Sequence, residues 1–434
     1  MLFVNPAVIR ADKKEQKSRG ILNLGIYCVS VCLKRVSKFT FVKPHKFKTM
    51  RKIFAALFIL CSTITMAQKQ TDDNTPQKIE GIVKVRMPIE WYIQQSKLWE
   101  QKVMSDTSNE DSWQNWLAAL HYAATMNEDK TDESLIEKRS QALKLLSEKL
   151  PDSPTRYILE MWIKGPLHPD CDKMSDELLS VVKNNLDRVE FYDNYIAYLL
   201  MKHPREESLI KEICNRWYRS SDYPSSMLNH FYNELSGLPE WSIIIGSGDL
   251  SIYSYLILQN VKGLFGNIIP VCSPLLYVKE YREHLCRKLN IPMMDDADTN
   301  DINKMFMHII KHSNRPVFFS STSPMPSFTE KLYSEGLVSR YSEKRYDNIA
   351  AKRRNFEENY LLDYLREDFE YSFPVYQRIK MNYVTVFASL LDHYKKTGNM
   401  QQYKRLHKLL KGIIESNTVL SDEEKLYYEQ QLNK

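Results

Sequence analysis

The chain has 434 residues, which is enough for two or three domains, and only 12 of them are glycine. So few glycines argue against a sandwich or barrel built on many tight turns. The formal charge of +6 is uneven, because residues 1–67 hold 13 of the 60 basic and 2 of the 54 acidic residues. Residues 68–434 therefore hold 47 basic and 52 acidic residues, a net charge of −5. This excludes the basic surface that nucleic-acid binding requires, so we expect no nucleic-acid partner.

Residues 50–67 have the three parts of a bacterial secretory signal peptide in order. Arg51 and Lys52 supply the positive start, an apolar run follows at residues 53–60, and Thr65-Met66-Ala67 is a small-x-small cleavage site. We expect residues 1–49 to be an upstream extension and cleavage after Ala67 to release a periplasmic or otherwise exported protein. The alternative is a buried helix in a longer cytosolic protein.

The segment after the predicted cleavage site is polar, and residues 68–86 are predicted to be a flexible leader. No later stretch approaches the roughly 20 apolar residues of a membrane span, so we expect none in the processed chain. Four cysteines remain there: Cys171, Cys214, Cys272 and Cys286. An oxidising compartment would permit disulfides, but their apolar or helical settings favour buried thiols.

Residues 87–238 are predicted to form a helical domain. Trp113, Trp116, Leu117 and Leu120 recur at helical spacing, which predicts one buried helix face. A helix over residues 134–150 ends at a Pro-Asp-x-Pro turn, as many tetratricopeptide repeats do, although no 34-residue period is present. The pattern indicates tetratricopeptide-like helical hairpins. Further helices are predicted at 176–185, 190–201, 205–218 and 224–235.

Residues 239–342 change to alternating strands and helices, typical of a small α/β domain with a parallel sheet. Short apolar runs predict strands at 241–245, 268–272, 316–320 and 337–341. Helices are predicted between them at 250–261, 275–289 and 301–312. Residues 343–434 are helical again, and two helices at 376–396 and 401–416 are predicted to form a C-terminal hairpin. The predicted fold class is therefore α plus α/β.

Two polar loops are predicted to meet where parallel strands end, which is where open α/β sheets hold ligands. The candidate ligand-binding residues are Gly246, Ser247, Gly248, Asp249, Ser320 and Ser321. The third glycine of a dinucleotide fingerprint is missing, so no cofactor is expected. Asp249 is better explained as the N-cap of the next helix.

Two clusters of side chains have part of a metal-binding pattern. Asp296, Asp298 and Asn300 match the first ligands of a calcium loop, but Asp301 replaces its turn glycine and Met307 its final Glu. His308 and His312 lie four apart on one predicted helix, without an accompanying Glu motif. A loop that caps the helix after Asn300 and a half-exposed histidine face are the preferred interpretations, so no metal site and no catalytic residue is assigned.

The order of several short motifs between residues 240 and 416 resembles the soluble C-terminal region of a family of bacterial multi-spanning membrane proteins related to protein O-mannosyltransferases. The motifs are Ser247-Gly248-Asp249, Tyr253 and Tyr255, Leu258-Gln259, Gly263, Arg315-Pro316-Val317-Phe318-Phe319, Glu335-Gly336-Leu337-Val338 with Arg340, and Gly398. The family's Asn-Gly-Asp-Asn-Asp is replaced here by Gly246-Ser247-Gly248-Asp249-Leu250. The transferase's catalytic acids lie in its membrane part, so the resemblance implies an envelope-facing module and no glycosyl transfer.

Three functions follow as hypotheses. The first is an exported, non-enzymatic cell-envelope module that binds a protein partner or a glycan. The second is an envelope glycan hydrolase or transferase that uses the crevice at residues 246–249. The third is a helical scaffold that binds proteins. The lack of a matched acid/base pair favours the first and third.

Overall fold

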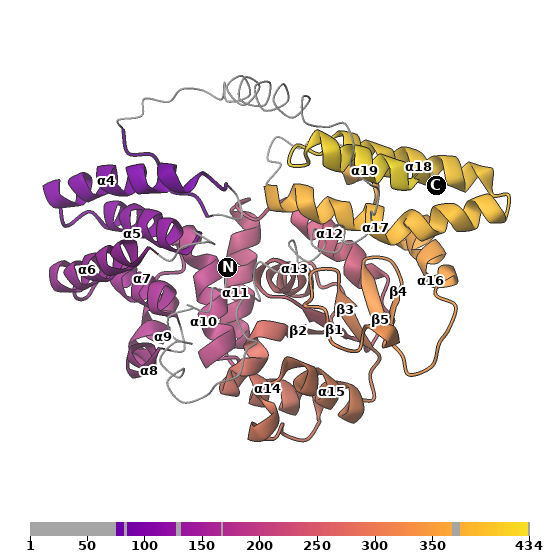
Figure 1. Ribbon diagram of the computed structural model, residues 1–434. Coiled ribbons are helices and arrows are strands. Elements are labelled where there is room, and N and C mark those ends of the chain that lie inside the picture. Colours follow the sequence, from indigo (N-terminus) through magenta and orange to yellow (C-terminus); the bar gives the residue numbers. More distant parts are fainter. Residues whose placement is uncertain (1–74, 82–84, 127–131, 166–167, 367–373, 433–434) are drawn as a thin grey trace, which may run out of the picture. The chain divides into compact units, whose positions relative to one another are not determined.

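The computed structural model describes residues 75–81, 85–126, 132–165, 168–366 and 374–432 (Figure 1). The predicted upstream extension and signal peptide lie outside these residues. The described chain separates into two units, one formed mainly by residues 88–144 and the other by residues 145–432. None of the described helices has both the length and the apolar character needed to cross a membrane.

The first unit is a set of helices held by aromatic packing. It contains α4 (Ile89–Ser105), α5 (Glu110–Thr125) and most of α6 (Glu133–Lys149). Asn109 caps α5 by accepting from the N–H of Ser112, and the predicted Trp113 stripe is buried. Tyr92 of α4 packs edge-on against Tyr122 of α5, with ring centres 5.4 Å apart. Part of the predicted leader is tied to this unit, because the N–H of Ile79 donates to Asn115.

The second unit begins with helices that lead into the sheet. They are α7 (Pro154–Lys164), α8 (Pro169–Lys173), α9 (Ser175–Asn184), η2 (Val189–Phe191), α10 (Tyr192–Lys202), α11 (Glu207–Arg219) and α12 (Ser225–Ser236). The predicted Pro-Asp-x-Pro turn is present: Ser153 caps α7 and Pro154 is its first residue, where a missing N–H has no cost. The four helices predicted between residues 176 and 235 are observed as α9 to α12.

A five-stranded sheet in the order β2-β1-β3-β5-β4 follows. Its strands are β1 (Ile243–Gly246), β2 (Ile269–Cys272), β3 (Val317–Ser320), β4 (Leu332–Ser334) and β5 (Val338–Tyr341). Strands β2, β1 and β3 are parallel as predicted, but β5 is antiparallel to both β3 and β4. The prediction of an entirely parallel sheet is therefore wrong. Only residues 335–337 link β4 to β5, and a link this short can join only antiparallel strands, as in a hairpin.

Helices cover the parallel strands on both faces. The helices and turns between and after these strands are α13 (Asp249–Asn260), η3 (Ser273–Tyr277), α14 (Lys279–Leu289), η4 (Asp296–Asp298), α15 (Ile302–His312) and η5 (Thr329–Lys331). The chain moves from β1 to β2 in one direction and then back past β1 to β3. Right-handed crossovers therefore place α13 on one face and α14 and α15 on the other (Figure 1). The topological switch point falls between β1 and β3.

The chain ends in helices: α16 (Ile349–Arg354), the π-turn η6 (Asn355–Asn359), η7 (Asp363–Arg366), α17 (Pro374–Lys396), α18 (Met400–Glu415) and α19 (Asp422–Leu432). The predicted hairpin is α17 and α18, and Asn399 caps α18 by accepting from Gln402. One face of α17, formed by Phe387, Leu390, Leu391 and Tyr394, is buried. The α plus α/β fold class is confirmed.

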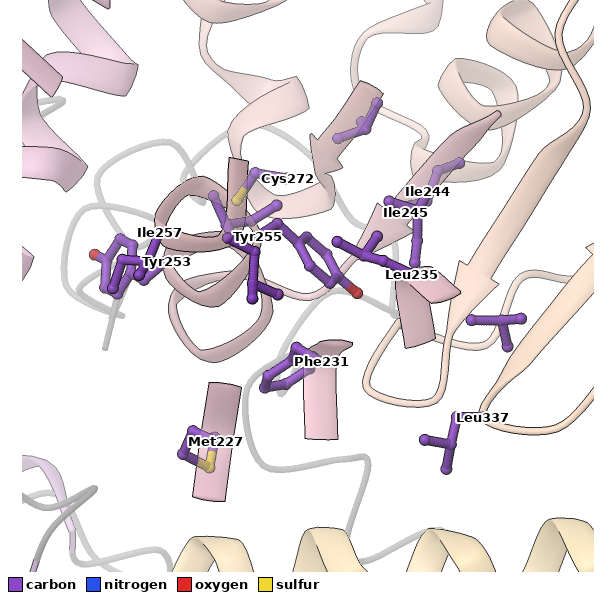
Figure 2. Close-up of a cluster of buried hydrophobic side chains, with 14 of the residues drawn as sticks. Met227, Phe231, Leu235, Ile244, Ile245, Tyr253, Tyr255, Ile257, Cys272 and Leu337 are labelled. Atoms are coloured by element: carbon purple, nitrogen blue, oxygen red, sulfur yellow. The ribbon is translucent and has the colours of Figure 1, made fainter. Parts of the chain in front are cut away.

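The core joins α12 and α13 to the sheet. Figure 2 shows the Tyr255 ring of α13 between Phe231 and Leu235 of α12 and Ile244 and Ile245 of β1. The rings of Phe231 and Tyr255 meet edge-on, with centres 5.6 Å apart. This packing fixes where the Tyr255 hydroxyl group lies.

Candidate functional site

The predicted loop at the end of β1 turns directly into α13. A Cβ atom on the buried Gly246 would lie 2.4 Å from Ser251 Oγ, so the close approach of α13 requires glycine. Gly248 occupies the N-cap position with a φ of +114°, a conformation that favours glycine. The prediction that Asp249 is the N-cap is wrong, because the chain needs this positive φ one residue earlier and Asp249 is the first helical residue. Ser247 is half-buried between these glycines.

Ser320 and Ser321 lie at the same edge of the sheet as this loop. Ile245 pairs with Phe319 in the parallel register, so Gly246 and Ser320 are the last residues of neighbouring strands, at their carboxyl ends. Ser320 is buried and Ser321 is half-buried. The prediction that the loops at residues 246–249 and 320–321 lie at the same edge of the sheet is therefore confirmed.

A buried carboxyl group fills the space beside these strand ends. Glu234 of α12 is fully buried. Its Oε2 accepts from the Tyr255 hydroxyl at 2.5 Å, and its Oε1 accepts from the hydroxyls of Ser320 at 3.0 Å and Ser321 at 2.7 Å. The Ser321 N–H also donates to Oε1, at 3.2 Å. Four donors thus satisfy one carboxyl group, and they bind α12 to α13 and to the end of β3.

The network continues from Ser321 to the C-terminal helices. Asn382 of α17 donates from Nδ2 to Ser321 Oγ at 3.0 Å. One residue before the buried Glu234, Asn233 donates to the Leu361 carbonyl at 2.9 Å and to the Tyr383 hydroxyl at 2.8 Å, and its Oδ1 accepts from the Leu361 N–H at 2.8 Å. We call Glu234, Tyr255, Ser320, Ser321 and Asn382 the carboxyl-edge cluster.

Burial dominates the electrostatics of the cluster. It raises the pKa of Glu234 above its ordinary value, against the hydrogen bonds from Tyr255, Ser321 and Ser320, which lower it. The pKa of Tyr255 is also raised, by burial and by the neighbouring Glu234. The enclosed carboxyl group connects α12, α13 and the end of β3 next to the switch point.

His230 lies one helical turn before Glu234 and is equally buried. Its Nε2 is 3.8 Å from Glu234 Oε1, beyond hydrogen-bond distance, and neither ring nitrogen has a hydrogen-bond partner among the described residues. The ring packs edge-on against Phe231 and Tyr383, with centre distances of 5.0 Å and 5.5 Å. Burial lowers the pKa of His230 to about 3, so the imidazole is neutral in the folded protein.

We predict that His230 makes the protein acid-sensitive. An unfolded-state pKa of 6.5 against a folded value of about 3 means that the unfolded chain takes up the proton first, so stability falls below pH 6.5. Between pH 7.5 and pH 5.5 this linkage costs about 1.4 kcal/mol. Urea unfolding of the wild type and of His230→Leu at both pH values should show that the variant does not lose this part of the free energy of unfolding at pH 5.5. An equal pH dependence in the two proteins would contradict it.

The acidic loop at residues 296–301 and the pair His308 and His312, which have part of a metal-binding pattern, make other contacts. Asp301 caps α15 by accepting from Asn303, and Asp298 pairs with Lys304 at 2.7 Å, as expected for a capping loop. The rings of His308 and His312 lie 4.5 Å apart, and His308 Nε2 is 2.9 Å from the Pro292 carbonyl. Within the described ranges, no three His, Cys, Asp or Glu side chains are grouped to hold a metal ion.

The four cysteines that remain after residue 67 are all buried, and the described chain contains no disulfide between them. Burial raises the pKa of Cys214 and of Cys272 to about 12. Thiols with such pKa values are poor nucleophiles at neutral pH. They belong to the core, as their apolar settings predicted.

Sequence reasoning missed the residue at the centre of the cluster. Glu234 follows His230 at i+4 within the apolar face of α12, between Phe231 and Leu235. The sequence does contain a signal for Glu234: a carboxyl group on the apolar face of an amphipathic helix will be buried, and a buried carboxyl group needs several hydrogen-bond donors around it. Comparisons with protein-family models, with the curated proteins and with the solved structures find no match for this chain.

Proposed function

We propose that the chain is an exported cell-envelope protein that binds a protein partner or a glycan and performs no chemistry on it. Three sequence features support this: the signal-peptide pattern at residues 50–67, the negative charge of residues 68–434, and the resemblance to an envelope-facing module. The proposal also takes the helical hairpins, including α17 and α18, as tetratricopeptide-like contact surfaces.

One observation carries the non-enzymatic part of the proposal. In open α/β folds, reacting groups gather at the carboxyl edge of the strands near the switch point. Here the carboxyl group at that place, Glu234, is fully buried and has four donors of the protein itself. A general acid or base must reach its substrate. Glu234 instead connects α12, α13 and β3.

Binding by the whole chain tests this proposal. We expect the chain to be retained on an array of envelope glycans, or to be cross-linked to an envelope protein in cells. Asp249→Ala tests whether the loop after β1 contacts the glycan. Weaker retention of this variant on the array would show that the loop takes part in binding, and unchanged retention would show that the glycan binds elsewhere. Failure of both glycan retention and cross-linking would refute the proposal.

The alternative, an envelope glycan hydrolase or transferase, is favoured by one contact. The half-buried Ser321 hydroxyl donates to Glu234 at 2.7 Å, the arrangement of a nucleophile beside its base. A fluorophosphonate probe would distinguish the two functions. Covalent labelling that is lost in Ser321→Ala would favour the enzyme, whereas an unlabelled wild-type chain is expected for a binding module.

A further inference from the structure

A pocket lies at the opposite, amino edge of the sheet, away from the carboxyl-edge cluster. Its volume is about 340 Å³, within the roughly 300–1,000 Å³ of small-ligand sites. Helix α15, the start of β3 and the end of β5 form its walls. The lining residues that matter here are Met307, Ile310, Lys311, Arg315, Tyr341 and Glu343.

The two cationic residues that line the pocket, Lys311 and Arg315, outnumber its single carboxylate, Glu343. Glu343 is already bound, since its Oε2 lies 2.7 Å from Lys331 Nζ and its Oε1 accepts from the Tyr341 hydroxyl. The bond from Lys331 lowers the pKa of Glu343, which keeps it ionised and paired. Lys311 is exposed and forms no salt bridge in the part of the chain that the structure describes, but its charge also lowers the pKa of Glu343. An anionic group is the natural complement of Lys311.

An exposed aromatic ring, Trp241, contacts Arg315, which lines this pocket. Trp241 is 57% exposed and has a φ of +65°. Such a conformation is strained for a bulky residue, and strained residues are concentrated at functional sites. The Arg315 guanidinium carbon lies 4.6 Å from the centre of a Trp241 ring, and Arg315 Nη1 donates to the Asn267 carbonyl at 2.9 Å. The indole is therefore held in place while much of it faces solvent.

The indole and the pocket share one edge of the sheet. Ile243 pairs with Val317, so extending this register by two residues puts Trp241 beside Arg315, which also lines the pocket. Arg315 links the two features, since it lines the pocket and stacks on the ring of Trp241, which is not itself a lining residue. An aromatic ring at the margin of a pocket that holds apolar side chains and an ammonium group suits a ligand with apolar ring faces and a carboxylate. Acidic sugars have both.

We propose that this amino-edge pocket binds a carboxylate-bearing saccharide, with Lys311 contacting the carboxylate and Trp241 packing against a sugar ring. The inference rests on the proposed binding function and names its ligand class and its site. Met307 and Ile310 supply the apolar wall. Because Lys311 is exposed, affinity should fall as salt is added.

Calorimetric titration of the whole chain with tri-galacturonic acid, and with its methyl ester, tests this inference. The acid should bind at least fivefold more tightly than the ester. Lys311→Gln should weaken acid binding at least fivefold, and so should Trp241→Asn, which removes the ring but tolerates a positive φ. Lys395→Gln, on an exposed part of α17, is the matched control and should bind like the wild type.

Several results would overturn the inference without touching the proposed function. These are no binding of the acid, equal binding of acid and ester, unchanged affinity in both pocket variants, or equally tight binding of a short poly-glutamate peptide. In each case, retention on the glycan array or cross-linking to an envelope protein would still support a binding module that works elsewhere. Loss of all retention and cross-linking would refute the proposed function itself.

Discussion

Glu234→Ala is expected to lower the free energy of unfolding by about 3 kcal/mol. The substitution removes the acceptor for three hydroxyl groups and one N–H, and it leaves the Tyr255 hydroxyl buried without its partner. It also opens a cavity where the carboxyl group lay. Urea unfolding followed by circular dichroism measures the loss.

Two variants control for this result. Glu234→Gln keeps an oxygen for the serine donors and should lose less than half as much stability. Glu330→Ala removes an exposed carboxyl group from the same unit and should change stability by less than about 0.5 kcal/mol. If Glu234→Ala were as stable as Glu330→Ala, the carboxyl-edge cluster would not hold the domain together.

Asn233→Ala should have the second largest effect, a loss of about 2–3 kcal/mol. The fully buried Asn233 satisfies both backbone groups of Leu361 and donates to Tyr383, so its removal breaks three hydrogen bonds between α12 and the C-terminal segment. The midpoint of urea unfolding should fall accordingly.

The control for Asn233 is another helical asparagine. Asn215 of α11 is half-buried, and its side chain donates to the carbonyl of Lys211 in its own helix, its one hydrogen bond among the described residues. Asn215→Ala should leave stability unchanged or slightly raised, since alanine is the better helix former. Equal losses in the two variants would contradict the role given to α12.

The elements with a strong local pattern were predictable. The apolar run Ile243-Ile244-Ile245 predicted β1, and Ser153 with Pro154 indicated the start of α7. Strand β4 was not predicted, because its residues are all half-buried and form no continuous apolar run. Strand β5 was predicted at 337–341, but its antiparallel direction was missed, because strand direction depends on the link to β4 more than on the strand's own residues.

The candidate site was predictable only in its glycines and serines. Strand ends and glycines placed Gly246 and Ser320 at one edge of the sheet. Glu234 was missed because its role depends on partners far along the chain: Tyr255 lies 21 residues away and Ser321 lies 87. The N-cap is Gly248 and not Asp249, because Gly248 has a positive φ that the residue types alone did not predict.

The central claim is that the chain is exported to the cell envelope. N-terminal sequencing of the protein recovered from each native cell fraction tests it most directly. We predict a single mature form that begins at Gln68 and is found outside the cytoplasm. An intact start at Met1, or recovery from the cytosol alone, would contradict the account.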